Sequence, residues 1–132
     1  MFMVDTNICV YLIKQSRARV VDRFREVGAD AVSISAIVFG ELEVGVAKSA
    51  HPERNAEALA TLLAALRVDP FDDRAAAAYG TVRADLERRG TPIGILDMLI
   101  AGHALGLGHT LVTNNEREFS RVTGLKIENW TR

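Results

Sequence analysis

Short runs that suit buried strands alternate along the chain with longer segments in which apolar residues recur every three or four positions. The short runs are residues 2–4, 31–34, 67–69, 110–113 and 126–128. The longer segments predict helices over about 6–14, 18–27, 36–47, 52–66, 73–89 and 96–105, with a short turn or helix near 115–119. This alternation predicts an α/β fold, with a mostly parallel central sheet of about five strands and helices on both faces.

Residues that start and end helices support these boundaries. Favourable first residues precede or open four of the segments: Thr6 or Asn7, Ser35, Pro52, and Asp72 or Asp73. Glycines that end helices follow three of them: Gly28, Gly90 and Gly106. No repeat, low-complexity tract or Pro/Gly/Ser-rich linker divides the chain, so we expect one domain over residues 1–132.

The composition is that of a globular protein, because 48% of the 132 residues are hydrophobic and 25% are charged. No apolar run approaches the ~18 residues of a membrane-spanning helix, so we expect no membrane association. Asp5 comes too early for a signal peptide. Cys9 is the only cysteine, which excludes a disulfide framework within the chain and indicates a reducing cytoplasm.

A net charge of −1 argues against nucleic-acid binding through bulk electrostatics, although it permits a local basic patch. One stretch is strongly basic and contains Lys14, Arg17, Arg19, Arg23 and Arg25. Its two interpretations are contact with phosphate and a solvated helix face, and the composition favours the second.

Polar residues gather where the predicted strands end, the edge at which parallel sheets bind ligands. Asp5 follows the first strand, and Asn114, Asn115, Glu116 and Glu118 follow the fourth. Taken alone, such an acid is equally well explained as a helix cap.

Two further acids lie within largely apolar helical segments. Glu41 stands among Ile37, Val38, Phe39, Leu42 and Val44, and Asp97 precedes Met98-Leu99-Ile100-Ala101. A carboxylate in apolar surroundings is costly unless it is paired or binds a metal. If several of these acids converged, they would form an oxygen-only site for Mg²⁺ or Mn²⁺ able to promote phosphodiester hydrolysis.

At these residues the chain resembles the PIN-domain proteins, and among them the VapC-type toxins of bacterial toxin–antitoxin pairs. The resemblance covers nearly the whole chain and rests on four motifs in order: Val4-Asp5-Thr6-Asn7; Ser35 through Glu41-Leu42 to Gly45; Gly90-Thr91-Pro92-Ile93-Gly94 with Asp97 and Leu99 to Ala104; and Thr113-Asn114-Asn115 with Glu118-Phe119, Gly124-Leu125 and Asn129-Trp130. Each motif alone is weak, and their order and spacing together are a strong signal.

The resemblance implies an endoribonuclease that requires a divalent cation, Mg²⁺ or alternatively Mn²⁺. It implies that Asp5 and Asp97 are the main metal ligands and that Glu41 completes the catalytic set. Glu118 best matches the family's variable fourth acid, with Glu116 facing elsewhere. The remaining positions that it implies around the acids are Thr6, Asn7, Thr113 and Asn115.

The resemblance also implies partners. They are a structured RNA, with tRNA anticodon loops as the favoured target, a second copy in a homodimer, and a VapB-type antitoxin whose C-terminal segment wraps the toxin. DNA would be contacted only through the antitoxin. The apolar helix containing Leu59 and Leu66 is a candidate docking surface or part of the core.

The chain departs from close relatives at Val38, where many have threonine, and at Ile95-Leu96, where a more polar pair is common. Neither change removes an acid. The main alternative is a non-catalytic PIN scaffold that binds RNA or a protein. A phosphoacceptor domain lacks its expected lysine here, and a haloacid-type phosphatase would need an acid where Asn7 stands.

Three other conspicuous residues are expected to be structural. His103 lies off the helical face of Asp97 and is expected to be a hydrogen-bonded packing residue. Trp130 is expected to pack beside the last strand, and Cys9 to be buried without a base that could activate it.

Overall fold

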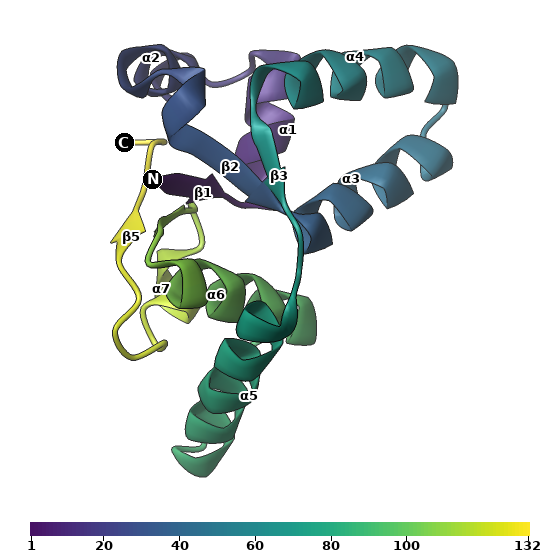
Figure 1. Ribbon diagram of the computed structural model, residues 1–132. Helices are drawn as coiled ribbons and strands as arrows, with labels where there is room; N and C mark the ends of the chain where they lie inside the picture. Colours follow the sequence, from purple (N-terminus) through teal and green to yellow (C-terminus); the bar gives the residue numbers. More distant parts are fainter.

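Five parallel strands form a single sheet in the order β3-β2-β1-β4-β5 in the computed structural model, which describes residues 1–132 (Figure 1). The strands are β1 (Phe2–Val4), β2 (Val32–Ser35), β3 (Arg67–Asp69), β4 (Thr110–Val112) and β5 (Ile127–Glu128). At the centre, Phe2 pairs with Val32 on one side and with Thr110 on the other. The predicted parallel α/β sheet is confirmed.

Helices cover both faces of the sheet, as predicted. They are α1 (Thr6–Lys14), α2 (Ala18–Val27), α3 (Ala36–Lys48), α4 (Pro52–Ala65), α5 (Asp73–Arg88), α6 (Ile95–Leu107) and α7 (Glu116–Phe119). Right-handed crossovers lead outward from β1 to β3 and then back across to β4, so α1 to α4 lie on one face and α5 to α7 on the other. In Figure 1, α1, α2 and α4 lie above the sheet, α3 extends to its right, and α5 to α7 lie below it.

The strand order reverses at β1, which has β2 on one side and β4 on the other. The carboxyl ends of strands beside such a reversal form the crevice in which open α/β sheets bind ligands. Met3, Val4, Leu111 and Val112 are fully buried at this centre, so the core fixes the strand ends rigidly. None of the helices combines the length and apolar character needed to cross a bilayer.

Two predicted helix boundaries were wrong. Gly106 does not end a helix, because α6 continues to Leu107 and ends at Gly108, whose φ is 70°. Gly102 and Gly106 instead allow α5 to approach closely: a Cβ at Gly102 would lie 2.6 Å from the Cα of Tyr79. At the other end of the chain, Asp5 caps α1 rather than Thr6 or Asn7.

Smaller differences concern strand ends. Residues 29–31 form a 3₁₀ turn after Gly28, so the second strand begins at Val32 rather than at residue 31. Leu59 and Leu66, which the sequence left as part of a docking surface or of the core, are both buried in the core.

Candidate active site

Asp5 leaves β1 with extended backbone angles and turns directly into α1. Its Oδ1 accepts a hydrogen bond from the backbone N–H of Ile8 at 3.1 Å, and its own N–H donates to the carbonyl of Val112 on β4. The residue is 6% exposed. Burial raises the pKa of Asp5 above its usual value, and hydrogen bonds from Thr113 and Ile8 offset only part of this effect. Asp5 is therefore both a helix cap and a buried carboxylate with a raised pKa.

The loop after β4 connects Asp5 to a second acid. Thr113 is fully buried and bonds to Asp5, while its hydroxyl oxygen accepts the backbone N–H of Asn115 at 2.9 Å. The side-chain amide of Asn115 donates to Oε2 of Glu118 at 3.3 Å. These contacts hold the Glu118 side chain on the same side of the short helix α7 as Asp97.

Asp97 lies half-buried in the first turn of α6, across the crevice from Asp5. Its pKa is raised to about 6, first by burial and then by the nearby negative charges of Glu118, Glu41 and Asp5. No protein donor hydrogen-bonds to this carboxylate. Gly94 lies close beside the carboxylate, since a Cβ at that position would be in van der Waals contact with Oδ2 of Asp97, 3.5 Å away.

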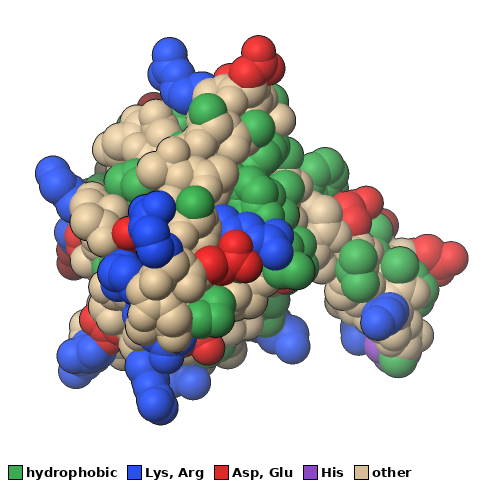
Figure 2. Space-filling model, turned by 90° about the horizontal axis from the view of Figure 1, so that it is seen from below, with side chains coloured by type: hydrophobic (Ala, Val, Ile, Leu, Met, Phe, Trp, Pro, Cys, Tyr) green, Lys and Arg blue, Asp and Glu red, His purple; other side chains and the backbone are tan.

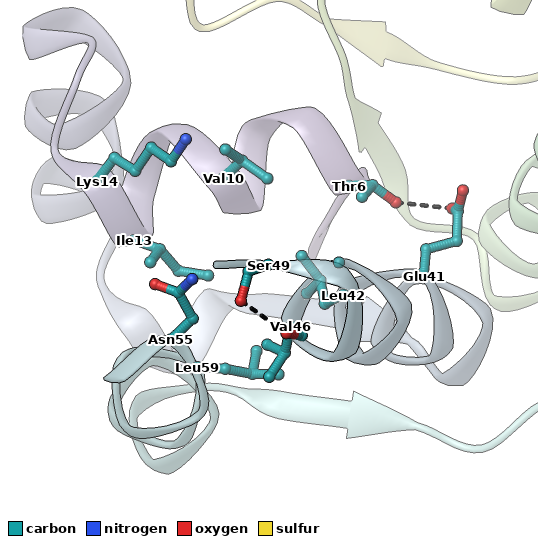
Figure 3. Close-up of a pocket in the computed structure, with 11 residues that line it drawn as sticks. Thr6, Val10, Ile13, Lys14, Glu41, Leu42, Val46, Ser49, Asn55 and Leu59 are labelled. Atoms are coloured by element: carbon teal, nitrogen blue, oxygen red, sulfur yellow. Dashed lines mark hydrogen bonds between the residues drawn. The ribbon is translucent and has the colours of Figure 1, made fainter. Parts of the chain in front are cut away.

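Glu41 reaches the same region from α3, on the opposite face of the sheet from α6. Its Oε1 accepts a hydrogen bond from the hydroxyl of Thr6 at 2.7 Å, and Figure 3 shows the two side chains pointing toward one another. Thr6 is the first residue of α1, directly after Asp5. The β1–α1 junction thus orients two acids, one through Asp5 itself and the other through Thr6.

The structure brings the four predicted acids into one electrostatic cluster, although their side chains are not arranged as a closed metal site. No group of three or more Asp, Glu, His or Cys side chains is already placed to hold a metal ion. The reason lies in their contacts, because Glu41 is turned toward Thr6 and one oxygen of Asp5 toward Ile8. The available donors are all oxygens, the type that Mg²⁺ and Mn²⁺ prefer.

Glu116 is directed away from this cluster. Its Oε2 accepts from the side-chain amide of Asn129 at 3.0 Å and pairs with Arg132 near the C-terminus. The structure thus places Glu118, and not Glu116, next to Asp97. Asn7 is exposed and reaches Asp5 only through its backbone N–H. The other three neighbours that the resemblance implies contact the acids through their side chains.

A groove of about 300 Å³ leads away from the acids between α1, α3 and α4. Figure 3 shows Thr6 and Glu41 at one end of it and Lys14 and Asn55 at the other. Its apolar walls come from Val10, Ile13, Leu42, Val46 and Leu59. Sequence reasoning missed this groove, although the helical spacing of Thr6, Val10 and Ile13 marks one of its walls.

The three residues expected to be structural are confirmed as such. His103 is 1% exposed, and its Nδ1 lies 2.7 Å from the hydroxyl of Ser35, the residue that caps α3. Trp130 is buried against Phe2, with ring centroids 5.6 Å apart. Cys9 is fully buried, which raises the pKa of its thiol and leaves it unreactive.

Comparison with known proteins agrees with this geometry. The family model of the PIN domain matches residues 2–125. The tRNA(fMet)-specific endonuclease VapC of Salmonella typhimurium is 43% identical over 129 residues, covering 98% of this chain and 97% of the relative. Ribonuclease VapC2 of Haemophilus influenzae is 40% identical over 129 residues, with the same coverage.

Solved structures give the same result. The toxin chain in VapBC from Salmonella typhimurium bound to DNA superposes with a TM-score of 0.92 at 43% identity, covering 98% of this chain and 97% of that one. VapBC2 from Rickettsia felis, bound to a DNA fragment from its promoter, gives 0.91 at 38% identity and 98% coverage of both chains. The chain therefore belongs to the PIN-domain family and, within it, to the VapC ribonucleases.

Proposed function

We propose that this protein is the toxin of a toxin–antitoxin pair and acts as a divalent-metal-dependent endoribonuclease. The observation that carries the proposal is Asp97: a half-buried carboxylate without a protein donor, whose pKa is raised to about 6 beside three other acids. Such a cluster is electrostatically unfavourable by itself. It becomes favourable when a cation is bound among the carboxylates.

The donor set fits Mg²⁺, with Mn²⁺ as an alternative. Asp5 and Asp97 would be the main ligands, and Glu41 would complete the set directly or through water. When bound, such a cation activates water and neutralises charge on the phosphate. The absence of a protein hydrogen-bond donor to Asp97 supports this assignment, because its carboxylate is free to turn toward the ion.

The protein's own residues would position the reaction. Ile8 and Thr113 fix Asp5, Thr6 fixes Glu41, and Asn115 holds Glu118. Asp5 thus has one oxygen committed to the cap of α1, which leaves the other for the site. Glu118 would accept a proton from the water that attacks phosphorus. The P–O3′ bond would break and the leaving 3′-oxygen would take up a proton from solvent water, so the products carry a 5′-phosphate and a 3′-hydroxyl. The 2′-hydroxyl is not the nucleophile.

The proposed substrate is a structured RNA, with tRNA favoured because the Salmonella relative is named for tRNA(fMet). The net charge of −1 and the mixture of positive and negative side chains in Figure 2 suit a selective substrate rather than any RNA. We place this activity in the cytoplasm, where tRNA is found.

The groove beside Glu41 is the proposed docking site for the antitoxin. Relatives are solved as VapBC complexes, some of them on DNA, so any DNA contact would be made through the antitoxin. An antitoxin segment with apolar side chains fits the walls, and a basic side chain at its end would reach Glu41. An arginine suits this place because its guanidinium can bridge two carboxylates.

A homodimer is proposed as well. Exposed aliphatic side chains flank the acids: Val44 stands three residues after Glu41, and Ile95 and Leu96 directly precede Asp97. Figure 2 shows hydrophobic side chains gathered between the main body and the projecting α3–α4 arm. A second copy that covered this surface would leave the acids accessible from one direction only.

The test of the catalytic function is cleavage of tRNA(fMet) by the purified protein with Mg²⁺, with Mn²⁺ and with EDTA. We expect discrete fragments that carry a 5′-phosphate, formed with either metal and absent with EDTA. Binding of the tRNA without cleavage under any metal condition would instead favour a non-catalytic PIN scaffold. Cleavage that persists in EDTA would contradict the metal dependence.

The test of inhibition uses the antitoxin of the same operon and a variant in which each arginine of its C-terminal segment is changed to glutamine. The variant should inhibit cleavage less well while its affinity for the toxin falls by a smaller factor. Equal inhibition by both forms would mean that the antitoxin acts by covering the site and not by placing a cation in it.

A further inference from the structure

A second group of side chains lies beside the acids, on a different face of α1 from the groove. It consists of Tyr11 on α1, Asn114 after β4 and Arg17 before α2, and we name it the Tyr11 cluster. The amide of Asn114 donates to the hydroxyl oxygen of Tyr11 at 3.1 Å. The guanidinium carbon of Arg17 lies 4.9 Å from the centroid of the Tyr11 ring.

The turn between α1 and α2 brings Arg17 into this position. Gln15 ends α1 with a φ of 51°, and it is the chain's only non-glycine residue with positive φ. The N–H of Ser16 then bonds to the carbonyl of Tyr11, which folds the chain back over the ring. A left-handed residue with these backbone bonds is a common way to end a helix, and here it directs the chain toward Arg17.

The cluster has unused binding capacity. Arg17 is exposed and forms no ion pair, whereas Arg23 in the same basic stretch pairs with Glu128 at 2.9 Å. Asn114 is exposed and keeps its carbonyl oxygen and one amide hydrogen free. The hydroxyl of Tyr11 accepts from Asn114 and retains its own hydrogen for another acceptor.

The position of the cluster relative to the acids is fixed by the backbone. Asn114 stands between Thr113, which bonds to Asp5, and Asn115, which bonds to Glu118. Consecutive Cα atoms lie only about 3.8 Å apart, so a ligand across the acids extends directly onto Asn114. The cluster therefore lies directly beside the catalytic acids, at the loop that carries two of their contacts.

Its chemistry suits an unpaired nucleotide. Bases in RNA loops stack on aromatic rings and on arginine planes, and their edges are recognised by groups such as the asparagine amide. Arginine also binds phosphate through two parallel hydrogen bonds. The antitoxin groove, by contrast, has apolar walls from Val10 and Ile13 on another face of the helix.

We propose that Tyr11, Arg17 and Asn114 form a subsite for an unpaired nucleotide next to the scissile phosphate, with its base stacked on the outer side of Arg17. This inference rests on the proposed ribonuclease function and adds the residues that would select loops over duplexes.

The experiment measures binding and cleavage separately. Binding uses the Asp97→Asn protein, which is expected not to cleave, and two labelled probes: the anticodon stem-loop of tRNA(fMet) and a fully paired RNA duplex of the same length. The variants are Arg17→Gln and Asn114→Ala, with Tyr11→Phe to remove only the hydroxyl. The matched control is Arg25→Gln, another exposed arginine of the basic stretch without an ion pair.

Arg17→Gln should weaken stem-loop binding about tenfold and duplex binding less than about twofold, because the loss is mainly that of a stacked base. In the cleaving protein it should raise KM by a similar factor with kcat nearly unchanged. Asn114→Ala and Tyr11→Phe should show smaller losses of the same kind, and Arg25→Gln should change little.

The proposal is overturned if Arg17→Gln and Arg25→Gln have equal effects, or if duplex binding falls as much as stem-loop binding, since either result means unspecific charge attraction. Loss of antitoxin binding in place of RNA binding also overturns it. A wild type that binds the stem-loop through this cluster and never cleaves it would refute the ribonuclease function and leave the subsite standing.

Discussion

The two main acids of the site differ in how the protein holds them. Asp5 is almost fully buried, caps α1 through Ile8 and receives a further hydrogen bond from Thr113. Asp97 is half-exposed, receives no hydrogen bond, and is surrounded by three other carboxylates. Hydrogen bonds at the β1–α1 junction therefore hold the carboxylate of Asp5 in place, while no protein group compensates the charge of Asp97 in the first turn of α6.

An acidic residue in a catalytic site can contribute both to the stability of the fold and to catalysis, and the difference between Asp5 and Asp97 allows the two contributions to be measured separately. The carboxylate of Asp5 serves the fold and the site together, so substitutions there can change both. The carboxylate of Asp97 receives no hydrogen bond that would stabilise the fold. Its substitution should therefore change catalysis without lowering the stability of the fold.

The largest expected effect is on catalysis. Asp5→Asn and Asp97→Asn should each reduce cleavage of tRNA(fMet) at least about 100-fold, because placement of the cation contributes several kcal/mol to transition-state stabilisation. Initial rates with excess Mg²⁺ provide the measurement. Glu116→Gln is the control and should retain the wild-type rate, since Glu116 contacts Asn129 and Arg132. A folded Asp97→Asn protein that cleaves at the wild-type rate would refute the assignment.

The next effect concerns the fourth acid. Glu118→Gln should reduce cleavage about tenfold, which is less than the ~100-fold or more typical for loss of a general base, because Asp5, Asp97 and Glu41 would still hold the cation. Glu118 also contributes to the raised pKa of Asp97, so the same change should lower that pKa. If Glu116→Gln were the more damaging of the two substitutions, the loop after β4 would be placed incorrectly.

A smaller effect distinguishes the cap from the ligand at Asp5. Asn caps helices as well as Asp does, whereas Ala does not, so Asp5→Ala should lower the free energy of unfolding by about 1 kcal/mol relative to Asp5→Asn. Both variants should be equally inactive. Chemical denaturation in EDTA measures the difference. Equal stability of the two variants would show that the bond to Ile8 contributes nothing.

The smallest effect is the pH dependence of stability. The pKa of Asp97 is raised to about 6 in the folded protein from 3.8, so between these values the folded state binds more protons than the unfolded state. Stability from this group is therefore lost as the pH rises through about 4 to 6. Solvent screens the charge of this partly exposed group and reduces the effect. In EDTA, the fall in Tm over this range should therefore be only about 2 °C larger for the wild type than for Asp97→Asn. Identical pH profiles would contradict the crowding of charge at Asp97.

Much of the fold was predictable because its signals are local. The apolar runs and capping residues indicated all five strands and seven helical segments within a few residues. Gly106 was misassigned because a glycine that ends a helix and one that admits a neighbouring helix look the same in a sequence. Only the approach of α5 to Gly102 and Gly106 distinguishes them, and that contact is long-range.

The site was predictable in its residues and less so in its contacts. Asp5, Glu41, Asp97 and Glu118 follow from strand ends and from the family motifs, and the structure gathers them. The hydrogen bond from Thr6 to Glu41 joins residues 35 positions apart, so no local pattern indicates it. The link from Asn114 to Tyr11 spans 103 positions and was invisible for the same reason.

The most direct test of the account is the position of a bound Mn²⁺ in crystals of the protein, located by anomalous scattering. We expect a peak in contact with carboxylate oxygens of both Asp5 and Asp97, with Glu41 turned from Thr6 toward the ion or linked to it through water. The same crystals of Asp97→Asn should show no peak. A wild-type peak that avoids either aspartate, or one that persists unchanged in Asp97→Asn, would contradict the claim that these acids form one metal site.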